Sequence, residues 1–349
     1  MVFPRKEFNK ASVKDANMNK GMLADLFNRV EDEQYNIHSM LLLKGGSRVF
    51  RASAYGLSDD TKENVYSVSK SFTSVAIGIL YDLNLLKLDD YVLYFFENEV
   101  KEYLPGYEEL KVKHLLTMSV GQEEDVFRGL SHNVNIFETF FKQPLTKKPG
   151  EVFLYNNYAT FLLSAIVTKL TGKSLNDFLD EYLYCKIGME KPNWQAAGIF
   201  NLGCTGLEIS ANDMARFGVL LLNDGNWNGE QVVSKEYLDL ATSKQIDSEN
   251  GFQESEHSGY GYQFWMNDFG DYRCVGMAGQ YIFINKEHEL VFVVKSWEER
   301  CLVHLFENYI IPANVKGWKY VDYSLRDFIR KFNANSKELI KKEQEERLG

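Results

Sequence analysis

Two short β-prone segments open the patterned part of the chain. Residues 37–43 and 48–54 are rich in apolar and β-branched side chains, which is typical of strands. Between them, Lys44-Gly45-Gly46 is a turn signal. The two segments therefore predict a β-hairpin.

The hydrophobic period changes after residue 64. Val68, Phe72, Val75 and Ile79 recur every three or four positions, which predicts an amphipathic helix. Helical patterns then dominate from about residue 85 to residue 233, and one further helical segment lies near the N-terminus. The clearest of these helical segments are 20–29, 112–116, 161–170 and 211–222.

Strand character returns late in the chain, in four aromatic or β-branched segments at 260–266, 272–275, 281–284 and 290–294. Strands at both ends with helices between them predict an α/β (α+β) fold. We expect one antiparallel sheet from the N- and C-terminal segments, flanked by helices, with an inserted all-helical subdomain.

The predicted organisation is a single catalytic domain over residues 1–315. Its sheet region covers about 1–84 and 235–315, and its helical insertion covers about 85–234. Residues 316–349 form a charged tail with helical propensity, which we expect to be a solvated terminal helix. A helix that binds a partner is the alternative for this tail.

Composition excludes several classes of protein. The chain has 349 residues, 45% of them hydrophobic, as in an ordinary globular protein. Its net charge of −10 argues against a nucleic-acid partner, which would need a basic face. No run of about twenty apolar residues suggests a membrane span. The first twenty or so residues lack the apolar core of a secretion signal, so we expect a cytoplasmic protein.

Ser67-Val68-Ser69-Lys70 is the first candidate for chemistry. It stands where strand character gives way to a helix, and a spacing of three puts Ser67 and Lys70 on one side of the first turn. Free N–H groups and the positive dipole end at that position favour an oxyanion. The alternative is structural, with Ser67 as a helix N-cap and Lys70 as a surface lysine.

Tyr155-Asn156-Asn157 is the second candidate. It follows a Pro149-Gly150 turn and a short extended segment, and it opens the helical segment near 161–170. Read alone, Tyr155 fits a core aromatic residue and Asn157 fits a helix cap.

Together the two clusters resemble the serine β-lactamases and penicillin-binding proteins, class C β-lactamases in particular. The resemblance is carried by YSVSKSFTSVAIGIL, VKHLLTMSVGQ, PGEVFLYNNYATFLLSAIV, GLEISANDMARFG and GQYIFINKEHELVFVV, which occur in the family's order. It implies Ser67 as the nucleophile, Lys70 and Tyr155 as the pair that handles protons, and Asn157 as a substrate-positioning group. It also implies an oxyanion hole made by the backbone N–H groups of Ser67 and Met277.

The third motif of that family is altered. Where the family has Lys-Thr-Gly or His-Thr-Gly, the matching strand reads Cys274-Val275-Gly276, which removes the cation. The Gly-x-x-Gly-Gln that follows is closer to the esterase and 6-aminohexanoate-dimer hydrolase branch. In this alignment Gly276 and Gln280 are candidate substrate-binding residues.

These observations predict a serine hydrolase that cleaves a small-molecule ester or amide through an acyl-enzyme on Ser67. We expect no cofactor and no metal, since the histidines are dispersed and no ligand motif occurs. Two alternatives stay open on the same fold. One is a true β-lactamase or D-alanyl-D-alanine carboxypeptidase, and the other is a penicillin-binding sensor without turnover.

Overall fold

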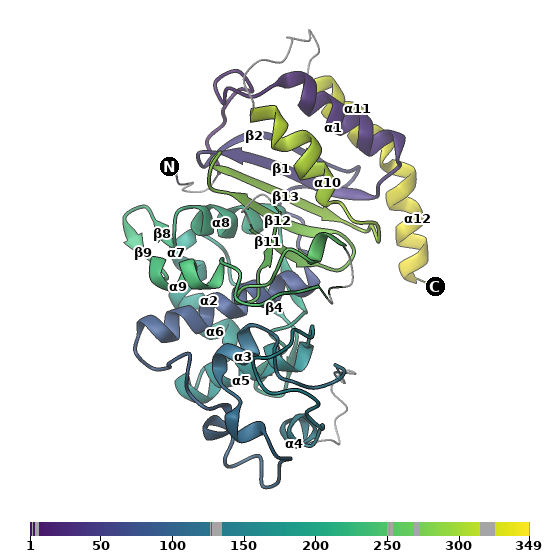
Figure 1. Ribbon diagram of the computed structural model, residues 1–349. Coiled ribbons are helices and arrows are strands. Elements are labelled where there is room, and N and C mark those ends of the chain that lie inside the picture. The colour runs from purple at the N-terminus through teal and green to yellow at the C-terminus, as the bar shows by residue number, and fades with distance from the viewer. Residues whose placement is uncertain are drawn as a thin grey trace.

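An antiparallel sheet organises the structure, a computed structural model (Figure 1). The model describes all of residues 1–349 except 2, 4–6, 126, 128–134, 250, 252–253, 269–271, 315–324 and 349. In the described chain the sheet has the strand order β10-β11-β12-β13-β1-β2. The strands are β1 (Ile37–Lys44), β2 (Ser47–Ser53), β10 (Trp265–Met266), β11 (Tyr272–Gly276), β12 (Gln280–Asn285) and β13 (Leu290–Ser296).

The sheet joins the two ends of the chain. Strand β1 pairs with both β2 and β13, and Leu41 lies opposite Val293. This confirms the predicted antiparallel sheet of N- and C-terminal segments. Strand β1 reads as a nearly continuous apolar run because both of its faces are buried: Met40 and Leu42 pack on one side, and Leu41 and Leu43 on the other.

The expected strand over 260–266 is much shorter than its composition suggests. Tyr260 forms an antiparallel bridge with Trp265, so the chain turns back on itself between them. Gln263 inside this turn takes a left-handed φ of 67°, which is incompatible with an extended strand. Only Trp265 and Met266 remain as strand β10.

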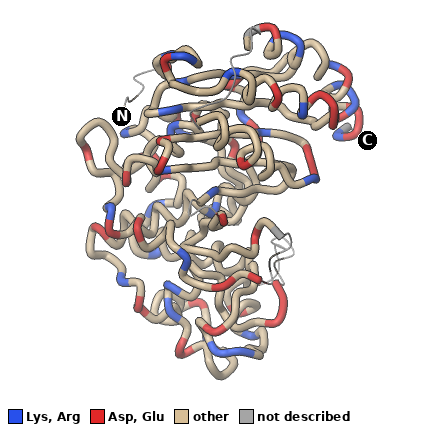
Figure 2. Tube along the Cα trace, turned by 45° about the horizontal axis from the view of Figure 1, so that its top comes forward, with Lys and Arg blue, Asp and Glu red and all other residues tan. Residues whose placement is uncertain are grey.

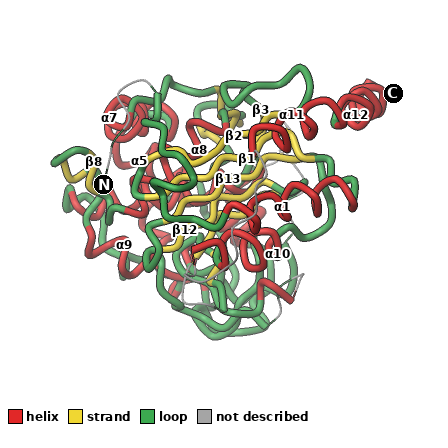
Figure 3. The backbone as a smooth tube through the Cα atoms, turned by 90° about the horizontal axis from the view of Figure 1, so that it is seen from above, coloured by secondary structure: helices red, strands yellow, loops and turns green. Residues whose placement is uncertain are grey.

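Helices cover both faces of the sheet. The helices α1 (Lys20–Asp32), α10 (Val303–Leu305) and α11 (Leu325–Asn335) lie on one face. Figure 3 shows the molecule from above, where α1 and α10 can be seen next to the strands β13 and β1. The helix α8 (Ala211–Leu222) packs on the other face, against β12 and β13. It therefore belongs to the sheet layer although it falls inside the predicted helical insertion.

The remaining helices form the lower part of the molecule in Figure 1 and the layer beside α8. They are α2 (Ser69–Asp82), α3 (Val112–Leu116), α4 (Ile136–Phe141), α5 (Asn157–Thr171), α6 (Leu175–Leu179), α7 (Cys185–Ile187) and α9 (Lys235–Ala241). Shorter helical turns are η1 (Tyr66–Val68), η2 (Val92–Phe95), η3 (Tyr107–Glu109), η4 (Asp180–Tyr184), η5 (Glu254–Glu256), η6 (Phe306–Ile310) and η7 (Pro312–Asn314).

The region 85–234 is mostly helical but not all-helical. Short strands also occur there. The short strands outside the main sheet are β3 (Glu63–Asn64), β4 (Asn193–Trp194), β5 (Ala196–Ala197), β6 (Phe200–Asn201), β7 (Leu207–Ile209), β8 (Asn226–Trp227) and β9 (Glu230–Gln231). Strand β5 pairs with β6 and β8 with β9 across short turns, whereas β7 pairs with β4 and with the distant β3.

The C-terminal tail is helical, as predicted, but it is not solvated all round. Its described part consists of α11 and α12 (Lys337–Leu348). Leu325, Phe332 and Ile340 are buried against the sheet layer because they form an apolar stripe along otherwise charged helices. Across the described trace, Lys and Arg are interspersed with Asp and Glu (Figure 2). None of the described helices has the length and apolar character needed to cross a bilayer.

Candidate active site

Ser67 lies in η1, one turn before α2, at the junction between the short strand β3 and that helix. Tyr66 has a left-handed φ of 46°, which turns the chain sharply at this point. Val68 is the N-cap of α2 and makes no side-chain cap bond. The Ser67 hydroxyl instead accepts a hydrogen bond from Lys70 Nζ at 3.1 Å, so Ser67 does not cap this helix.

Lys70 is not a surface lysine. Its side chain is 1% exposed, and burial of a cation is costly unless its donors are bonded. Besides Ser67, its Nζ bonds to Asn157 Oδ1 at 2.7 Å and to the backbone carbonyl of Cys204 at 2.9 Å. These three acceptors match the three N–H donors of an ammonium group.

Tyr155 and Asn157 come from the segment that leads into α5. The N-cap of α5 is Asn156, whose side chain accepts from Ala159 N, so Asn157 is free of the capping role. The Tyr155 ring centroid lies 4.8 Å from Lys70 Nζ. The same ring stacks on Trp265 with centroids 5.8 Å apart. Tyr155 and Asn157 thus reach the same amine from one side of the site.

The end of β11 closes the site from the other side. A Cβ added to Gly276 would lie 2.2 Å from the Val65 carbonyl oxygen and 3.3 Å from Ser67 N. Only glycine therefore lets β11 approach the backbone of the serine. Met277 follows directly, and its side chain is 66% exposed. This close approach brings the two segments expected to form the oxyanion hole side by side.

A cavity of about 480 Å³ opens in front of these groups. Ser67, Tyr155 and Asn157 all line it. Aromatic and aliphatic side chains form much of the remaining wall, and four charged residues also line it. These further lining residues include Trp265, Val275, Gly276, Met277, Tyr281, Glu256, Glu298, Glu299 and Arg300. An acyl group placed against Ser67 would be held mostly by apolar surface.

Comparison with protein families agrees with this geometry. The family model described as "Beta-lactamase" matches residues 27–296, most of the chain. The chain belongs to the β-lactamase family. The match includes Ser67, Lys70, Tyr155 and the strand that carries Gly276.

Individual relatives of this β-lactamase-family protein include hydrolases. It is 24% identical to the 6-aminohexanoate-dimer hydrolase of Paenarthrobacter ureafaciens, over 79% of this chain and 76% of the relative. The octameric penicillin-binding protein homologue from Pyrococcus abyssi has a TM-score of 0.68 at 20% identity, covering 84% of this chain and 76% of that one. A family VIII carboxylesterase has a TM-score of 0.65 at 16% identity, covering 83% of this chain and 96% of that one.

The third motif of this β-lactamase-family chain brings no cation into the cavity from β11. Cys274 is 1% exposed, and burial raises the pKa of its thiol to about 12. Arg273 is also buried, and its guanidinium donates to the Met266 carbonyl at 2.8 Å and to the side chain of Asn267. Val275 faces the cavity in their place. In the alignment expected from the sequence, Val275 takes the place of the motif's hydroxyl residue, so β11 adds an apolar side chain and no charge to this wall.

Gln280 is used within the fold. Its amide nitrogen donates to the backbone carbonyls of Ala278 and Ser296, and its side chain is 3% exposed. It is not among the described residues that line the cavity, whereas Gly276 is. Of the two candidate substrate-binding residues, only Gly276 therefore lies at the site.

Three groups at the site carry no signal in the sequence. Asp125 accepts hydrogen bonds from Asn157, Trp265 stacks on Tyr155, and the Cys204 carbonyl binds Lys70. Each acts across a long sequence separation, so neither periodicity nor motif spacing could find it. Cys204 contributes only its backbone, because burial raises the pKa of its thiol to about 11. Within the described ranges, no cluster of side chains could hold a metal ion.

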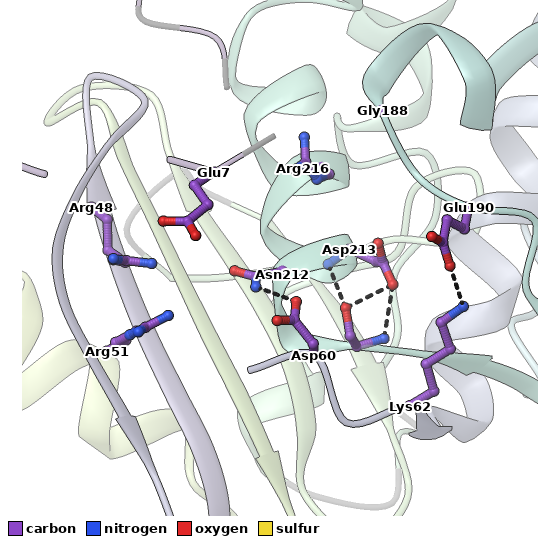
Figure 4. Close-up of a pocket in the computed structure, with 11 residues that line it drawn as sticks. Glu7, Arg48, Arg51, Asp60, Lys62, Gly188, Glu190, Asn212, Asp213 and Arg216 are labelled. Carbon is purple, nitrogen blue, oxygen red and sulfur yellow. Dashed lines mark hydrogen bonds and ion pairs between the residues drawn. The ribbon is translucent and has the colours of Figure 1, made fainter. Parts of the chain in front are cut away.

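A second cavity, of about 280 Å³, lies between β2 and the start of α8 (Figure 4). Its charged lining residues balance: four are cationic and four are acidic. Among them, Lys62 pairs with Glu190 and Arg51 pairs with nearby Asp59. Balanced ion pairs of this kind are structural, and they leave no surplus charge to select an ionic ligand. The charged residues are Glu7, Arg48, Arg51, Asp60, Lys62, Glu190, Asp213 and Arg216.

Proposed function

We propose that this protein is a serine hydrolase that cleaves an ester or amide bond through an acyl-enzyme on Ser67. The observation that carries the proposal is the contact between Lys70 Nζ and Ser67 Oγ at 3.1 Å, in a buried site that opens into a cavity. A serine becomes nucleophilic when an adjacent base takes its proton. The hydrolase relatives support the same reaction class.

In the acylation step, Ser67 Oγ bonds to the carbonyl carbon while its proton passes to Lys70 or Tyr155. The oxygen of the tetrahedral intermediate lies between the backbone N–H groups of Ser67 and Met277, which stabilise its negative charge. The proton then moves to the leaving alcohol or amine as its bond to carbon breaks. In deacylation, Tyr155 activates water to release the acid.

The proposed substrate is a small, uncharged ester or amide. Carboxylates outnumber cations among the charged residues that line the cavity, and Arg300 is bound to Glu298 with an N–O distance of 2.7 Å. A substrate carboxylate would therefore meet repulsion where the family's third motif supplies attraction. This feature disfavours β-lactams and peptide carboxylates relative to neutral esters.

The test is a set of reactions with a fluorophosphonate probe, p-nitrophenyl esters and nitrocefin, each repeated with Ser67→Ala. We expect labelling and ester turnover that vanish in this variant, and little turnover of nitrocefin. Ser71→Ala is the matched control, because it removes a hydroxyl one turn further along that donates to the Gln263 carbonyl and is not among the described residues lining the cavity. That control should retain labelling.

The other outcomes separate the alternatives. Fast nitrocefin turnover would assign the protein as a true β-lactamase. Stoichiometric labelling without turnover of any substrate would assign it as a sensor. If no reaction depends on Ser67, the proposed nucleophile is wrong.

A further inference from the structure

Asp125 holds Asn157 by two hydrogen bonds. Its Oδ2 accepts from Asn157 N at 3.1 Å and from Asn157 Nδ2 at 2.7 Å. Asn157 is the first residue of α5, where free N–H groups and the helix dipole favour a negative charge. The carboxylate is thus bound by both the backbone and the side chain of the same residue.

This contact decides which way the Asn157 amide faces. An ionised carboxylate only accepts hydrogen bonds, so Asn157 must turn its NH₂ group toward Asp125. Its Oδ1 then faces Lys70 Nζ at 2.7 Å. The oxygen and the NH₂ group of an amide are similar in size. Without an acceptor at position 125, nothing would therefore prevent the Asn157 amide from flipping.

The orientation of the amide in turn fixes the lone pair of Lys70. A neutral amine has two N–H donors and one lone pair. Asn157 Oδ1 and the Cys204 carbonyl are both acceptors, so they take the two hydrogens. Once the ammonium has given up the proton that it donates to Ser67 Oγ at 3.1 Å, the lone pair of the neutral amine is left facing that oxygen.

We propose that Asp125 is a positioning residue: it orients the amide of Asn157 and thereby directs the lone pair of Lys70 at Ser67. This inference rests on the proposed function. In the step it supports, the Ser67 hydroxyl proton moves to Nζ as Oγ bonds to the electrophile. A flipped Asn157 would offer an N–H to that lone pair and hold it away from the serine.

The first test measures the rate of fluorophosphonate labelling at Ser67 in Asp125→Asn. The introduced amide donates as well as accepts, so it no longer selects one orientation of Asn157. We expect labelling about 10- to 100-fold slower, the size of a misplaced catalytic group, with little change in Tm. Asp125→Ala should behave alike. Glu124→Gln, at the exposed neighbouring position, is the matched control and should label at the normal rate.

The second test is a double-mutant cycle with Asn157→Ala. If Asp125 acts through Asn157, adding Asp125→Asn to Asn157→Ala should change the labelling rate by less than about twofold. A normal rate in both Asp125 variants, or a full additional loss in the Asn157→Ala background, overturns the inference while the proposed function stands. Labelling of the unaltered protein that does not depend on Ser67 overturns both.

Discussion

At the scale of single residues, the site depends on which hydrogen-bond acceptors surround the buried amine of Lys70. Lys70 is surrounded by acceptors from three separate parts of the chain, and Tyr155 lies against it. Free Lys and Tyr have similar reference pKa values, near 10.4 and 10. In the proposed mechanism this similarity suits a pair that passes a proton back and forth during acylation and deacylation.

The role of Tyr155 is tested by Tyr155→Phe, which removes only the hydroxyl. We expect ester turnover to fall by at least about 100-fold, as for loss of a general acid–base group. Steady-state kinetics with a p-nitrophenyl ester gives the measurement. Tyr81→Phe is the control, because its hydroxyl bonds to Glu236 away from the cavity. Near-normal turnover in Tyr155→Phe would remove Tyr155 from the mechanism.

At the scale of elements, the approach of β11 to η1 shapes the proposed oxyanion hole. The approach is possible because Gly276 has no side chain at the point where β11 meets the Val65 carbonyl. The obstacle to a larger residue is backbone, which does not move aside as a flexible side chain would. Residue 276 therefore couples the position of the end of β11 to the position of Ser67.

Gly276→Ala should accordingly lower activity sharply. The added methyl would lie 2.2 Å from a carbonyl oxygen, so β11 or η1 must shift. We expect ester turnover to fall by about 100-fold, as for a misplacement near 1 Å. Gly198→Ala is a suitable control: its φ is 61°, but no other atom lies within 4 Å of the new methyl. Gly198→Ala should lose some stability and keep its activity. Equal losses of ester turnover in both variants would show that the close approach at Gly276 is not what matters.

At the scale of the whole molecule, the C-terminal helix α12 is joined to the sheet by a buried histidine. His38 on β1 contacts Glu63 Oε1 through Nδ1 at 2.7 Å and Glu343 Oε2 of α12 through Nε2 at 2.6 Å. Lys295 and Arg347 pair with these carboxylates in turn. The cluster links the last helix to the segment that leads into Ser67.

This cluster predicts how stability depends on pH. Burial lowers the pKa of His38, but the hydrogen bonds to Glu343 and Glu63 outweigh it and leave the pKa raised. The stabilisation from protonated His38 is therefore complete below about pH 6.5, its unfolded value, and is lost as the pH rises through the raised pKa. Burial raises the pKa of Glu63, but His38 and Lys295 lower it to about 2, so its contribution is complete above about pH 4.5 and is lost as the pH falls through 2.

The measurement is the free energy of unfolding at pH 6 and pH 9, for the unaltered protein and for His38→Gln. We expect the advantage of the unaltered protein over the variant to shrink between these two pH values. The difference between the two proteins removes the effect of other titrating groups. A constant difference across this range would show that His38 does not hold α12 as a cation.

Some features of this protein are set locally, and the sequence alone determined them. The periodicity of apolar residues predicted the strands and the helices, because backbone preference and burial act over a few neighbouring residues. The change of period also placed Ser67 at the boundary between a strand segment and a helix. The two motifs marked Ser67, Lys70, Tyr155 and Asn157 by resemblance to a known family. The apolar stripe of the C-terminal tail was also present, although its charge suggested a solvated helix.

Only the tertiary structure decided how these residues meet. Lys70 and Asn157 are 87 residues apart, and Lys70 and the Cys204 carbonyl are 134 apart. Asp125 lies in a polar segment with no pattern of its own, yet it determines which end of the Asn157 amide faces the lysine. Hydrogen bonds between distant segments depend on where the folded layers bring them, and no local periodicity records that. The proposed nucleophile was therefore visible in the sequence, while Asp125, which we propose orients its base through Asn157, was not.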